Sequence, residues 1–275
     1  MDKIRVAILG AGTVGTGVYK LINKQADEMI HKVGANIEIA KILVRNKNKT
    51  RDGIDSAYLT DNFDEILNDD SINIVVEVMG GIEPANTYIT QALKAKKNIV
   101  TANKDLIASK GHALMELAKE NGCDLLFEAA VAGAIPIIRP LKQCLAGNYI
   151  SEIMGIVNGT TNFILTKMTK EGMDFDEALK IAQDLGYAEA DPTADIEGYD
   201  AARKMAIMAS IAFNTRVTFD DVATEGITKI TSKDIKYAKD MDCTIKLLGV
   251  ARNDGNGIEV MVHPAYIIKS PISYS

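Results

Sequence analysis

The sequence predicts an α/β protein with two domains: a doubly wound parallel sheet, followed by an α+β domain. Two patterns predict this fold. Short, almost continuously apolar runs alternate with helical stretches through the first half, as expected for strands covered on both faces of a parallel sheet. After about Gly133 helical stretches dominate, and two strand-like runs come last. We therefore expect domains over residues 1–130 and 131–275.

In the first half, apolar runs predict the strands, and the helices between them are bounded by turn formers and capping residues. The third run follows the turn-forming cluster at 68–70, and Pro84 occupies the place of a first-turn proline. The expected strands are 4–9, 37–44, 72–79, 98–101 and 125–130, and the expected helices are 14–28, 85–95 and 106–121.

In the second half, a polar break at 158–162 separates an expected helix and strand from a run of helices. Asp176 can cap a helix that ends before Gly186. Residues 253–257 read Asn-Asp-Gly-Asn-Gly, which predicts a hairpin turn. The expected helices are 136–145, 163–169, 176–185 and 199–212, and the expected strands are 150–157, 245–251 and 258–263.

The composition excludes several classes of protein. Of the 275 residues, 47% are hydrophobic and 25% are charged, which is typical of a globular chain rather than a disordered one. The net charge of −6 and the aromatic content of 5% disfavour nucleic acid as a partner.

The chain carries no targeting or membrane signal that we can recognise. No apolar run reaches the roughly 18 residues that span a bilayer, and the first residues lack the pattern of a signal peptide. The three cysteines are far apart and odd in number, which disfavours a disulfide framework. We therefore expect a cytoplasmic protein with no membrane partner.

A glycine-rich turn is the first candidate site. Gly10, Gly12 and Gly15 match GxGxxG, directly after an apolar strand and at the start of a helix. Gly10 permits a tight turn, Gly12 lets the backbone approach a pyrophosphate, and Gly15 allows close packing of helix and strand. The helix start, with Thr13 and Val14, offers N–H groups to phosphate. The alternative is a glycine-rich turn without a ligand.

The end of the second strand bears on the choice of cofactor. A site selective for NAD usually has an acidic residue there to bind the ribose hydroxyls. Residues 44–49 contain none, and Arg45 could meet a 2′-phosphate, which favours NADP. The alternative is that Arg45 and the neighbouring lysines form a solvated loop.

A lysine and two acids share one face at the start of the helix expected over 199–212. Glu197, Asp200 and Lys204 lie at i, i+3 and i+7, and Asp200 and Lys204 are an i, i+4 pair. A positioned ammonium can stabilise and protonate the alkoxide that develops when hydride reduces an aldehyde. The alternative is a surface ion pair worth a few tenths of a kcal/mol.

Two further places carry charge that could meet a ligand. Glu189, Asp191 and Asp195 crowd one loop and could hold an amino group, or could simply cap a helix in solvent. Lys104 comes just after a short strand, hence at the carboxyl edge where parallel sheets bind ligands. An ordinary loop lysine is the alternative there.

The sequence resembles the homoserine dehydrogenases in several motifs that follow the family's order along nearly the whole chain. The most specific are residues 158–165 (NGTTNFIL), 186–195 (GYAEADPTAD) and 197–204 (EGYDAARK). Residues 101–104 (TANK) and 128–136 (EAAVAGAIP) also look like that family. The resemblance implies a Rossmann-type domain followed by a domain for catalysis and dimerisation, and hence a homodimer.

The resemblance also implies an activity and roles for individual residues. The activity is NAD(P)-dependent interconversion of L-homoserine and L-aspartate 4-semialdehyde, in the threonine and methionine branch of amino-acid biosynthesis. Lys204 is similar to the acid/base lysine and Asp200 to its catalytic neighbour. Glu189 looks like the ligand of the substrate amino group, with Asp195 nearby, and Lys104 like a second lysine at the nicotinamide.

A monovalent cation, usually sodium, belongs to the same implied site. By similarity, its ligands are largely main-chain oxygens, here those of Glu128, Val131, Gly133 and Ile135.

The sequence departs from the family at its end, because family members usually continue beyond residue 275, many into a regulatory ACT domain. We therefore keep an alternative open, a truncated dinucleotide-binding module without turnover. A reductase of similar layout that acts on another semialdehyde is a weaker third hypothesis.

Overall fold

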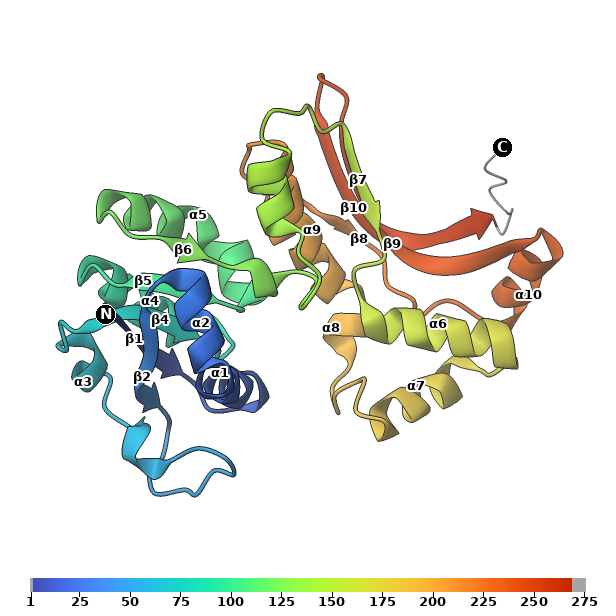
Figure 1. Cartoon of the computed structure of the whole chain (residues 1–275). Helices are drawn as coiled ribbons and strands as arrows, with labels where there is room; N and C mark the ends of the chain where they lie inside the picture. Colours follow the sequence, from blue (N-terminus) through green and yellow to red (C-terminus); the bar gives the residue numbers. More distant parts are fainter. Residues whose placement is uncertain (1, 269–275) are drawn as a thin grey trace. The chain divides into compact units, whose positions relative to one another are not determined.

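The computed structural model describes residues 2–268, so the end of the expected second domain, 269–275, lies outside the described residues. The chain divides into two compact units between Ile138 and Arg139 (Figure 1). Each unit has its own sheet. We describe the two units separately.

The first unit is built on a six-stranded parallel sheet in the order β3-β2-β1-β4-β5-β6. The predicted α/β class with a parallel sheet is confirmed. The order runs in opposite directions on either side of β1 and β4, which creates a switch point at the carboxyl ends of these strands. The strands are β1 (Lys3–Leu9), β2 (Asn36–Leu43), β3 (Leu59–Thr60), β4 (Ile72–Glu77), β5 (Asn98–Thr101) and β6 (Leu125–Leu126).

Two expected segments of the first unit, one helix and one strand, have different bounds in the structure, and the short helix at Asp64–Leu67 and strand β3 were not expected. The helix expected over 14–28 is two helices, because the backbone leaves helical geometry at Gln25 (φ −110°, ψ 20°). The strand expected over 125–130 ends after Leu126, where Phe127 turns and its carbonyl accepts from the Ala130 N–H at 3.0 Å. The helices are α1 (Thr13–Lys24), α2 (Ala26–Val33), α3 (Asp64–Leu67), α4 (Ala85–Lys94) and α5 (Lys104–Glu120), with 3₁₀ turns at Ser56–Tyr58 and Glu128–Ala130.

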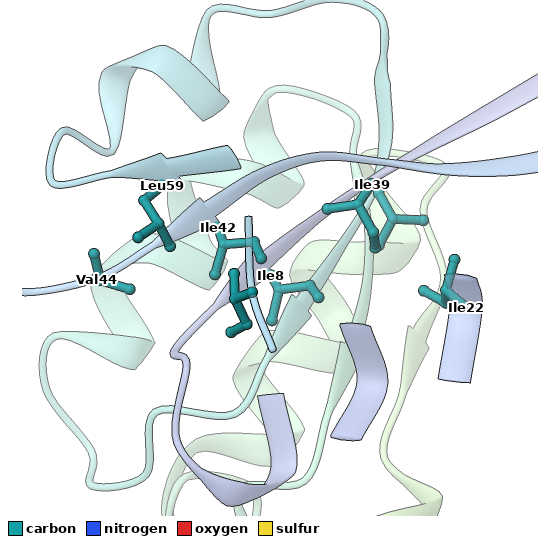
Figure 2. Close-up of a cluster of buried hydrophobic side chains, with 8 residues drawn as sticks. Ile8, Ile22, Ile39, Ile42, Val44 and Leu59 are labelled. Carbon is teal, nitrogen blue, oxygen red and sulfur yellow. The ribbon is translucent and has the colours of Figure 1, made fainter. Parts of the chain in front are cut away.

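A cluster of branched aliphatic side chains forms the core on one side of this sheet (Figure 2). Ile8 of β1 is fully buried, Ile39 and Ile42 come from β2, and Ile22 comes from α1. Burying each such side chain stabilises the fold by about 1.5–3 kcal/mol. This packing fixes α1 against β1, and with it the glycine turn that joins them.

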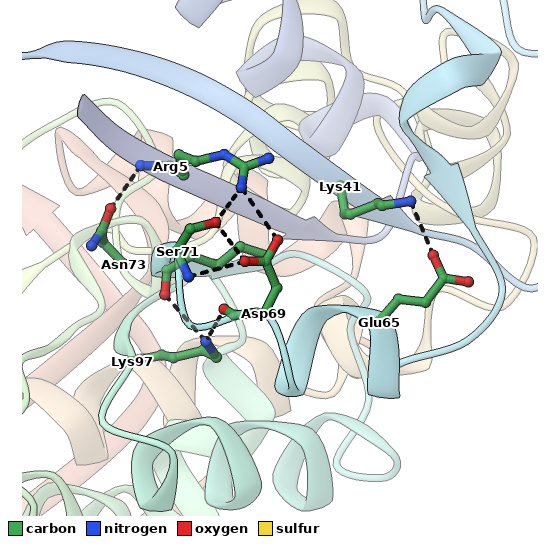
Figure 3. Close-up of polar contacts among 8 residues, drawn as sticks. Arg5, Lys41, Glu65, Asp69, Ser71, Asn73 and Lys97 are labelled. Atoms are coloured by element: carbon green, nitrogen blue, oxygen red, sulfur yellow. Dashed lines mark hydrogen bonds and ion pairs between the residues drawn. The ribbon is translucent and has the colours of Figure 1, made fainter.

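A buried lysine holds the amino end of the sheet (Figure 3). Lys97 is 2% exposed, and its Nζ donates to the carbonyls of Asp69 at 2.7 Å and Ile72 at 3.2 Å. Arg5 of β1 pairs with the Asp69 carboxylate at 3.3 Å and also contacts Ser71. Burial lowers the pKa of Lys97, and the charges of Asp69 and Asp70 offset part of that effect.

The second unit contains a four-stranded sheet in the order β7-β9-β10-β8. The predicted hairpin at 253–257 is present, because β9 and β10 pair antiparallel from Asn253 and Ile258 outward. Strand β7 pairs antiparallel with β9, and β8 pairs parallel with β10. The strands are β7 (Glu152–Gly155), β8 (Ala223–Thr224), β9 (Cys243–Asn253) and β10 (Ile258–Ile268).

Two predictions for the helices of this unit need correction. The helix expected over 136–145 spans only 138–144, with π-helical geometry at Pro140–Cys144, and the N–H groups of Ile137 and Ile138 bind the Glu128 carboxylate. The polar break at 158–162 is the cap and first turn of a helix, since the Asn158 side chain accepts from the Thr161 N–H. The helices are α6 (Gly159–Glu171), α7 (Phe175–Asp184), α8 (Thr193–Ile196), α9 (Tyr199–Ala212) and α10 (Ser232–Asp240).

Small side chains let α9 pack closely on the sheet of the second unit. A Cβ added to Gly249 of β9 would lie 2.4 Å from the Met205 sulfur, so no side chain larger than hydrogen fits there unless Met205 moves. Met205 and the α9 alanines Ala202, Ala206 and Ala209 are fully buried. This packing fixes the start of α9, which carries Asp200 and Lys204.

We predict that wild-type protein gains unfolding free energy relative to Lys97→Met as the pH rises from neutral toward 10.5. Folding lowers the pKa of Lys97 below 10.5, so within that window the unfolded chain binds more protons than the folded chain. The penalty of the buried charge is complete below the window and disappears as the folded lysine loses its proton. Urea unfolding at a series of pH values measures the difference.

The matched control for this prediction is Lys32→Met, since Lys32 is an exposed lysine of the same unit that pairs with Glu28. This variant keeps Lys97, so the gain in unfolding free energy that Lys97 causes as the pH rises should persist in it. At neutral pH, Lys97→Met should lower the unfolding free energy by about 1–3 kcal/mol, because it leaves buried carbonyls without donors. Parallel pH curves for wild type and Lys97→Met would contradict the assignment of a buried, titrating lysine.

Candidate functional site

The glycine turn between β1 and α1 has the geometry of a phosphate cradle. Gly10 has φ +108°, which favours glycine, and its N–H donates to the Leu43 carbonyl at 3.0 Å. A Cβ on Gly15 would lie 2.0 Å from the Gly10 carbonyl oxygen, so the helix can approach the strand only with glycine there. A Cβ on Gly12 would meet nothing within 4 Å, so open space lies over this residue.

The first turn of α1 carries backbone N–H groups that have no helical partners. The first intrahelical bond runs from the Thr16 N–H to the Gly12 carbonyl, so the N–H groups of Thr13, Val14 and Gly15 precede the helical ladder. The turn contains no acidic residue that would repel an anion. Backbone donors and the positive end of the helix dipole therefore suit a pyrophosphate at this place.

Arg45 lies at the same edge of the sheet, two residues after β2. Its exposed side chain forms no ion pair within residues 2–268. Its basic neighbours are engaged: Lys47 pairs with Asp61 at 3.1 Å, and the Arg51 guanidinium donates to the Lys49 carbonyl at 2.8 Å. The loop is therefore partly ordered by its own contacts, and the Arg45 side chain stays exposed in it.

Lys104 is the first residue of α5 and follows the carboxyl end of β5. The preceding residue, Asn103, fixes this turn: its Oδ1 accepts from the Leu106 N–H at 3.1 Å and its Nδ2 donates to the Gly81 carbonyl at 2.6 Å. Lys104 thus starts a helix whose cap is tied to the loop after β4.

A buried carboxylate that we did not predict supports this edge. Glu77 ends β4 and is 0% exposed. It accepts from the Thr101 hydroxyl at 2.6 Å and from the Met79 N–H at 2.8 Å. Glu77 therefore binds together the ends of β4 and β5. The sequence could have signalled it only as an acid at the end of an apolar strand.

The residues of the implied cation site lie in the segment after β6. The Glu128 carboxylate accepts from the N–H groups of Ile137 at 2.7 Å and Ile138 at 2.9 Å, which folds 128–138 back on itself. The Glu128 carbonyl accepts from Val131, and Gly133 has φ +57° and Ile135 is exposed. In the described part of the chain, His, Cys, Asp and Glu form no group of three that could hold a metal ion.

Lys204 and Asp200 form a buried pair on α9. The Lys204 Nζ lies 2.6 Å from Asp200 Oδ2, and the side chains are only 18% and 8% exposed. The Nζ also donates to the Val157 carbonyl at 2.9 Å. The alternative of a solvated surface pair does not describe this contact, because a buried charge must have its partners in place.

Asn158, which we did not predict as a site residue, connects this pair to Asp195. Its Nδ2 donates to Asp195 Oδ1 at 2.7 Å and to Asp200 Oδ2 at 2.9 Å. The residue is 4% exposed, and its Oδ1 caps α6. Asp195, Asp200 and Lys204, all predicted candidates, are therefore brought together. The signal that could have indicated Asn158 was its place in the NGTTNFIL motif.

The other acids of the loop before α8 behave differently. Asp191 accepts from the Thr193 hydroxyl at 2.6 Å and from its N–H at 3.1 Å, and these bonds lower the pKa of Asp191. Asp191 therefore forms a local turn just before α8, whose N-cap is Pro192. Glu189 is exposed, and its carbonyl accepts from the Gln183 side chain at 3.2 Å, while its carboxylate makes no hydrogen bond or ion pair within residues 2–268. The fold does not bond it to the Asp195–Asp200–Lys204 group.

A close backbone contact holds the turn between α8 and α9. A Cβ on Gly226 would lie 2.2 Å from the Ile196 carbonyl oxygen, and the Ile227 N–H donates to that oxygen at 2.8 Å. Gly198 then starts α9 with φ +83°. These contacts fix the spacing between Asp195 and Asp200.

The parallel sheet, its switch point and the glycine turn define the first unit as a dinucleotide-binding α/β domain. Family models agree for both units. The NAD-binding domain of homoserine dehydrogenase matches residues 10–128, and the homoserine dehydrogenase model matches 136–275. The chain belongs to the homoserine dehydrogenase family, as its motifs predicted.

Individual relatives are similar over nearly the whole chain. The homoserine dehydrogenase of Bacillus subtilis is 50% identical over 268 residues, which are 97% of this chain and 62% of the relative. That of Corynebacterium glutamicum is 47% identical over 98% of this chain and 61% of its own length. The chain thus spans about three fifths of these curated relatives.

Solved structures agree in fold. A homoserine dehydrogenase from Thiobacillus denitrificans has a TM-score of 0.95 and 45% identity, over 99% of this chain and 63% of that one. A putative homoserine dehydrogenase from Archaeoglobus fulgidus has a TM-score of 0.86 and 32% identity, over 98% of this chain and 85% of that one. A hyperthermophilic archaeal homoserine dehydrogenase in complex with NADPH has a TM-score of 0.81 and 27% identity, over 98% of this chain and 84% of that one.

Among residues 2–268, no helix is both long and apolar enough to cross a membrane.

We predict that Gly12→Ala folds normally but binds NADPH at least about tenfold more weakly, because the new methyl group occupies the space over the turn. Gly15→Ala should instead destabilise the fold, since its Cβ would overlap the Gly10 carbonyl. Calorimetric titration and thermal unfolding separate the two effects. Gly17→Ala is the control: it also meets nothing within 4 Å, but it lies outside the motif. Unchanged NADPH affinity in Gly12→Ala would contradict the assignment of this glycine turn as a phosphate-binding site.

Proposed function

We propose that the chain carries a homoserine dehydrogenase activity, the NAD(P)-dependent interconversion of L-homoserine and L-aspartate 4-semialdehyde. The observation that carries the proposal is the buried Lys204–Asp200 pair, with its Nζ 2.6 Å from the carboxylate, in a chain of this family. We place this role in cytoplasmic threonine and methionine biosynthesis, and we propose a homodimer formed through the second unit.

The first unit fits a nicotinamide dinucleotide. The open space over Gly12 and the N–H groups of Thr13, Val14 and Gly15 would hold its pyrophosphate, and Arg45 would meet a 2′-phosphate. When bound, the cofactor donates or accepts the hydride. Lys104, at the carboxyl edge of the same sheet, is proposed as the lysine at the nicotinamide.

Lys204 is proposed to transfer the proton. An ammonium has three N–H groups, and two of them point at Val157 O and Asp200 Oδ2. The third would donate to the substrate oxygen, which becomes an alkoxide in the reducing direction. The Asp200 carboxylate stabilises the charge of the ammonium by direct contact. In the oxidising direction, the lysine must first give up a proton and then receive the one from the hydroxyl.

The remaining family roles are proposed for the same residues. Glu189 and Asp195 would hold the substrate amino group, since an ammonium prefers carboxylate partners. Main-chain oxygens of Glu128, Val131, Gly133 and Ile135 would hold sodium. Carbonyl oxygens are hard donors that suit such an ion, and the Glu128 side chain closes the segment that carries them.

A nucleotide-binding module without turnover is the less supported function. The similarity extends through residues 136–275, and that part of the chain retains the buried Lys204–Asp200 pair.

We predict that Lys204→Met lowers the rate of homoserine oxidation by about 10²–10⁴-fold, because it removes the proton-transfer group. Formation of reduced nucleotide from L-homoserine and NADP⁺ gives the rate, and NADPH affinity should stay near that of wild type. The control is Lys180→Met, an exposed i, i+4 lysine paired with Asp184. Nucleotide binding without turnover in the wild-type chain would overturn the proposed activity, and normal turnover in Lys204→Met would overturn the proposed role.

We predict that Arg45→Gln raises the KM for NADP⁺ by about 10–100-fold and leaves the KM for NAD⁺ unchanged, because only NADP⁺ carries the phosphate that a charged donor would bind. Lys47→Gln serves as the control, since Lys47 is committed to Asp61. An equal effect of Arg45→Gln on both nucleotides would contradict the proposed preference for NADP.

A further inference from the structure

The side chain of Asn158 is almost completely buried and makes bonds to three separate elements. Its Nδ2 donates to Asp195 at the end of α8 and to Asp200 on α9, and its Oδ1 accepts from Thr161 in α6. We propose that Asn158 is a positioning residue for proton transfer: its amide bridges Asp195 and Asp200 and so fixes the direction of the free Lys204 N–H. This inference rests on the proposed function.

The orientation of the Asn158 amide is set from both ends. The Oδ1 accepts from the Thr161 N–H at 2.8 Å and from the Thr161 hydroxyl at 3.0 Å, so this end must carry an acceptor. The Nδ2 faces two carboxylate oxygens, so the other end must carry two donors. Only a primary amide of this length meets both requirements.

The Asn158 amide lies between two carboxylates that repel each other, those of Asp195 and Asp200. Asp195 Oδ1 and Asp200 Oδ2 bind the same nitrogen, so they lie within two hydrogen-bond lengths of each other, and like charges repel at that distance. Lys204 contacts Asp200 directly, whereas Asp195 makes no ion pair within residues 2–268. The two N–H groups of the amide therefore stabilise both acids without adding a charge.

The same segment also positions the lysine. Val157, the residue before Asn158, accepts from the Lys204 Nζ at 2.9 Å, and Asp200 Oδ2 accepts from it at 2.6 Å. Asn158 binds that same Asp200 oxygen at 2.9 Å. Val157 accepts one of the three ammonium protons, and Asp200, which Asn158 holds in place, accepts another. The direction of the third proton therefore depends on the position of residues 157–158. Displacement of Asp200 would redirect the proton that substrate receives.

Two substitutions separate the bridge from the helix cap. Asn158→Ser retains a capping oxygen for α6 and loses both donors to the acids. Asn158→Asp retains the cap and nearly the same shape, but it replaces the donors with a third carboxylate oxygen. If Asn158 only capped α6, both variants would behave like wild type, and any loss would not exceed that caused by removing an ordinary cap. Thr231→Ala provides that comparison, because Thr231 caps α10 in the same unit.

The first experiment measures steady-state kinetics and thermal unfolding of the full chain. We expect kcat for homoserine oxidation to fall by about 10–100-fold in Asn158→Ser and further in Asn158→Asp, with the KM for NADP⁺ unchanged. Thr231→Ala should lower the melting temperature and leave kcat unchanged. A kcat in Asn158→Ser within about twofold of wild type, measured where the variant is folded, would overturn the proposal.

A second measurement does not depend on turnover. In ¹⁵N-edited NMR spectra, the two side-chain amide protons of Asn158 are identified by their absence in Asn158→Ser. We expect Asp195→Asn to shift one of them and Asp200→Asn to shift the other. If the wild-type chain lacks turnover, the proposed function fails, but these spectra still test the bridge. Amide protons that respond to neither substitution would overturn it.

Discussion

The contact between the Lys204 ammonium and the Asp200 carboxylate is the interaction on which the proposed chemistry depends. On a surface such a pair contributes little, about 0–1 kcal/mol. At 18% and 8% exposure, both charges have lost most of their water and need partners with good geometry. The chain supplies these partners from Val157 and Asn158, which lie far from the pair in sequence. The Lys204–Asp200 pair therefore has its partners only when the second unit has folded.

The two units carry different kinds of functional groups. The first unit offers mainly backbone donors, the N–H groups around Gly12, which suit a ligand common to many enzymes. The second unit offers side chains with defined charge, whose spacing is fixed by close packing at Gly226 and Gly249. Family membership rests on both units, and specificity for substrate would rest on the second.

The sequence predicted features whose cause is local. The glycine turn follows from three glycines between a strand and a helix, and the Asp200–Lys204 pair follows from helical spacing. The sequence could not reveal contacts made over long separations, such as Asn158 with Asp200 or Glu77 with Thr101, because they depend on how the elements pack. The polar residues 158–162 looked like a break because a cap and a loop use the same residue types. The proposed cation ligands could not be found by spacing, since every residue has a carbonyl oxygen.

The most direct test of the account follows the hydride itself. L-Homoserine carrying deuterium at both C4 positions is incubated with NADP⁺ and the full chain in a single turnover, and the reduced nucleotide is analysed by mass spectrometry. The account predicts reduced nucleotide that carries one deuterium, together with L-aspartate 4-semialdehyde. Reduced nucleotide without deuterium, or none at all from a chain that binds NADP⁺, would contradict it.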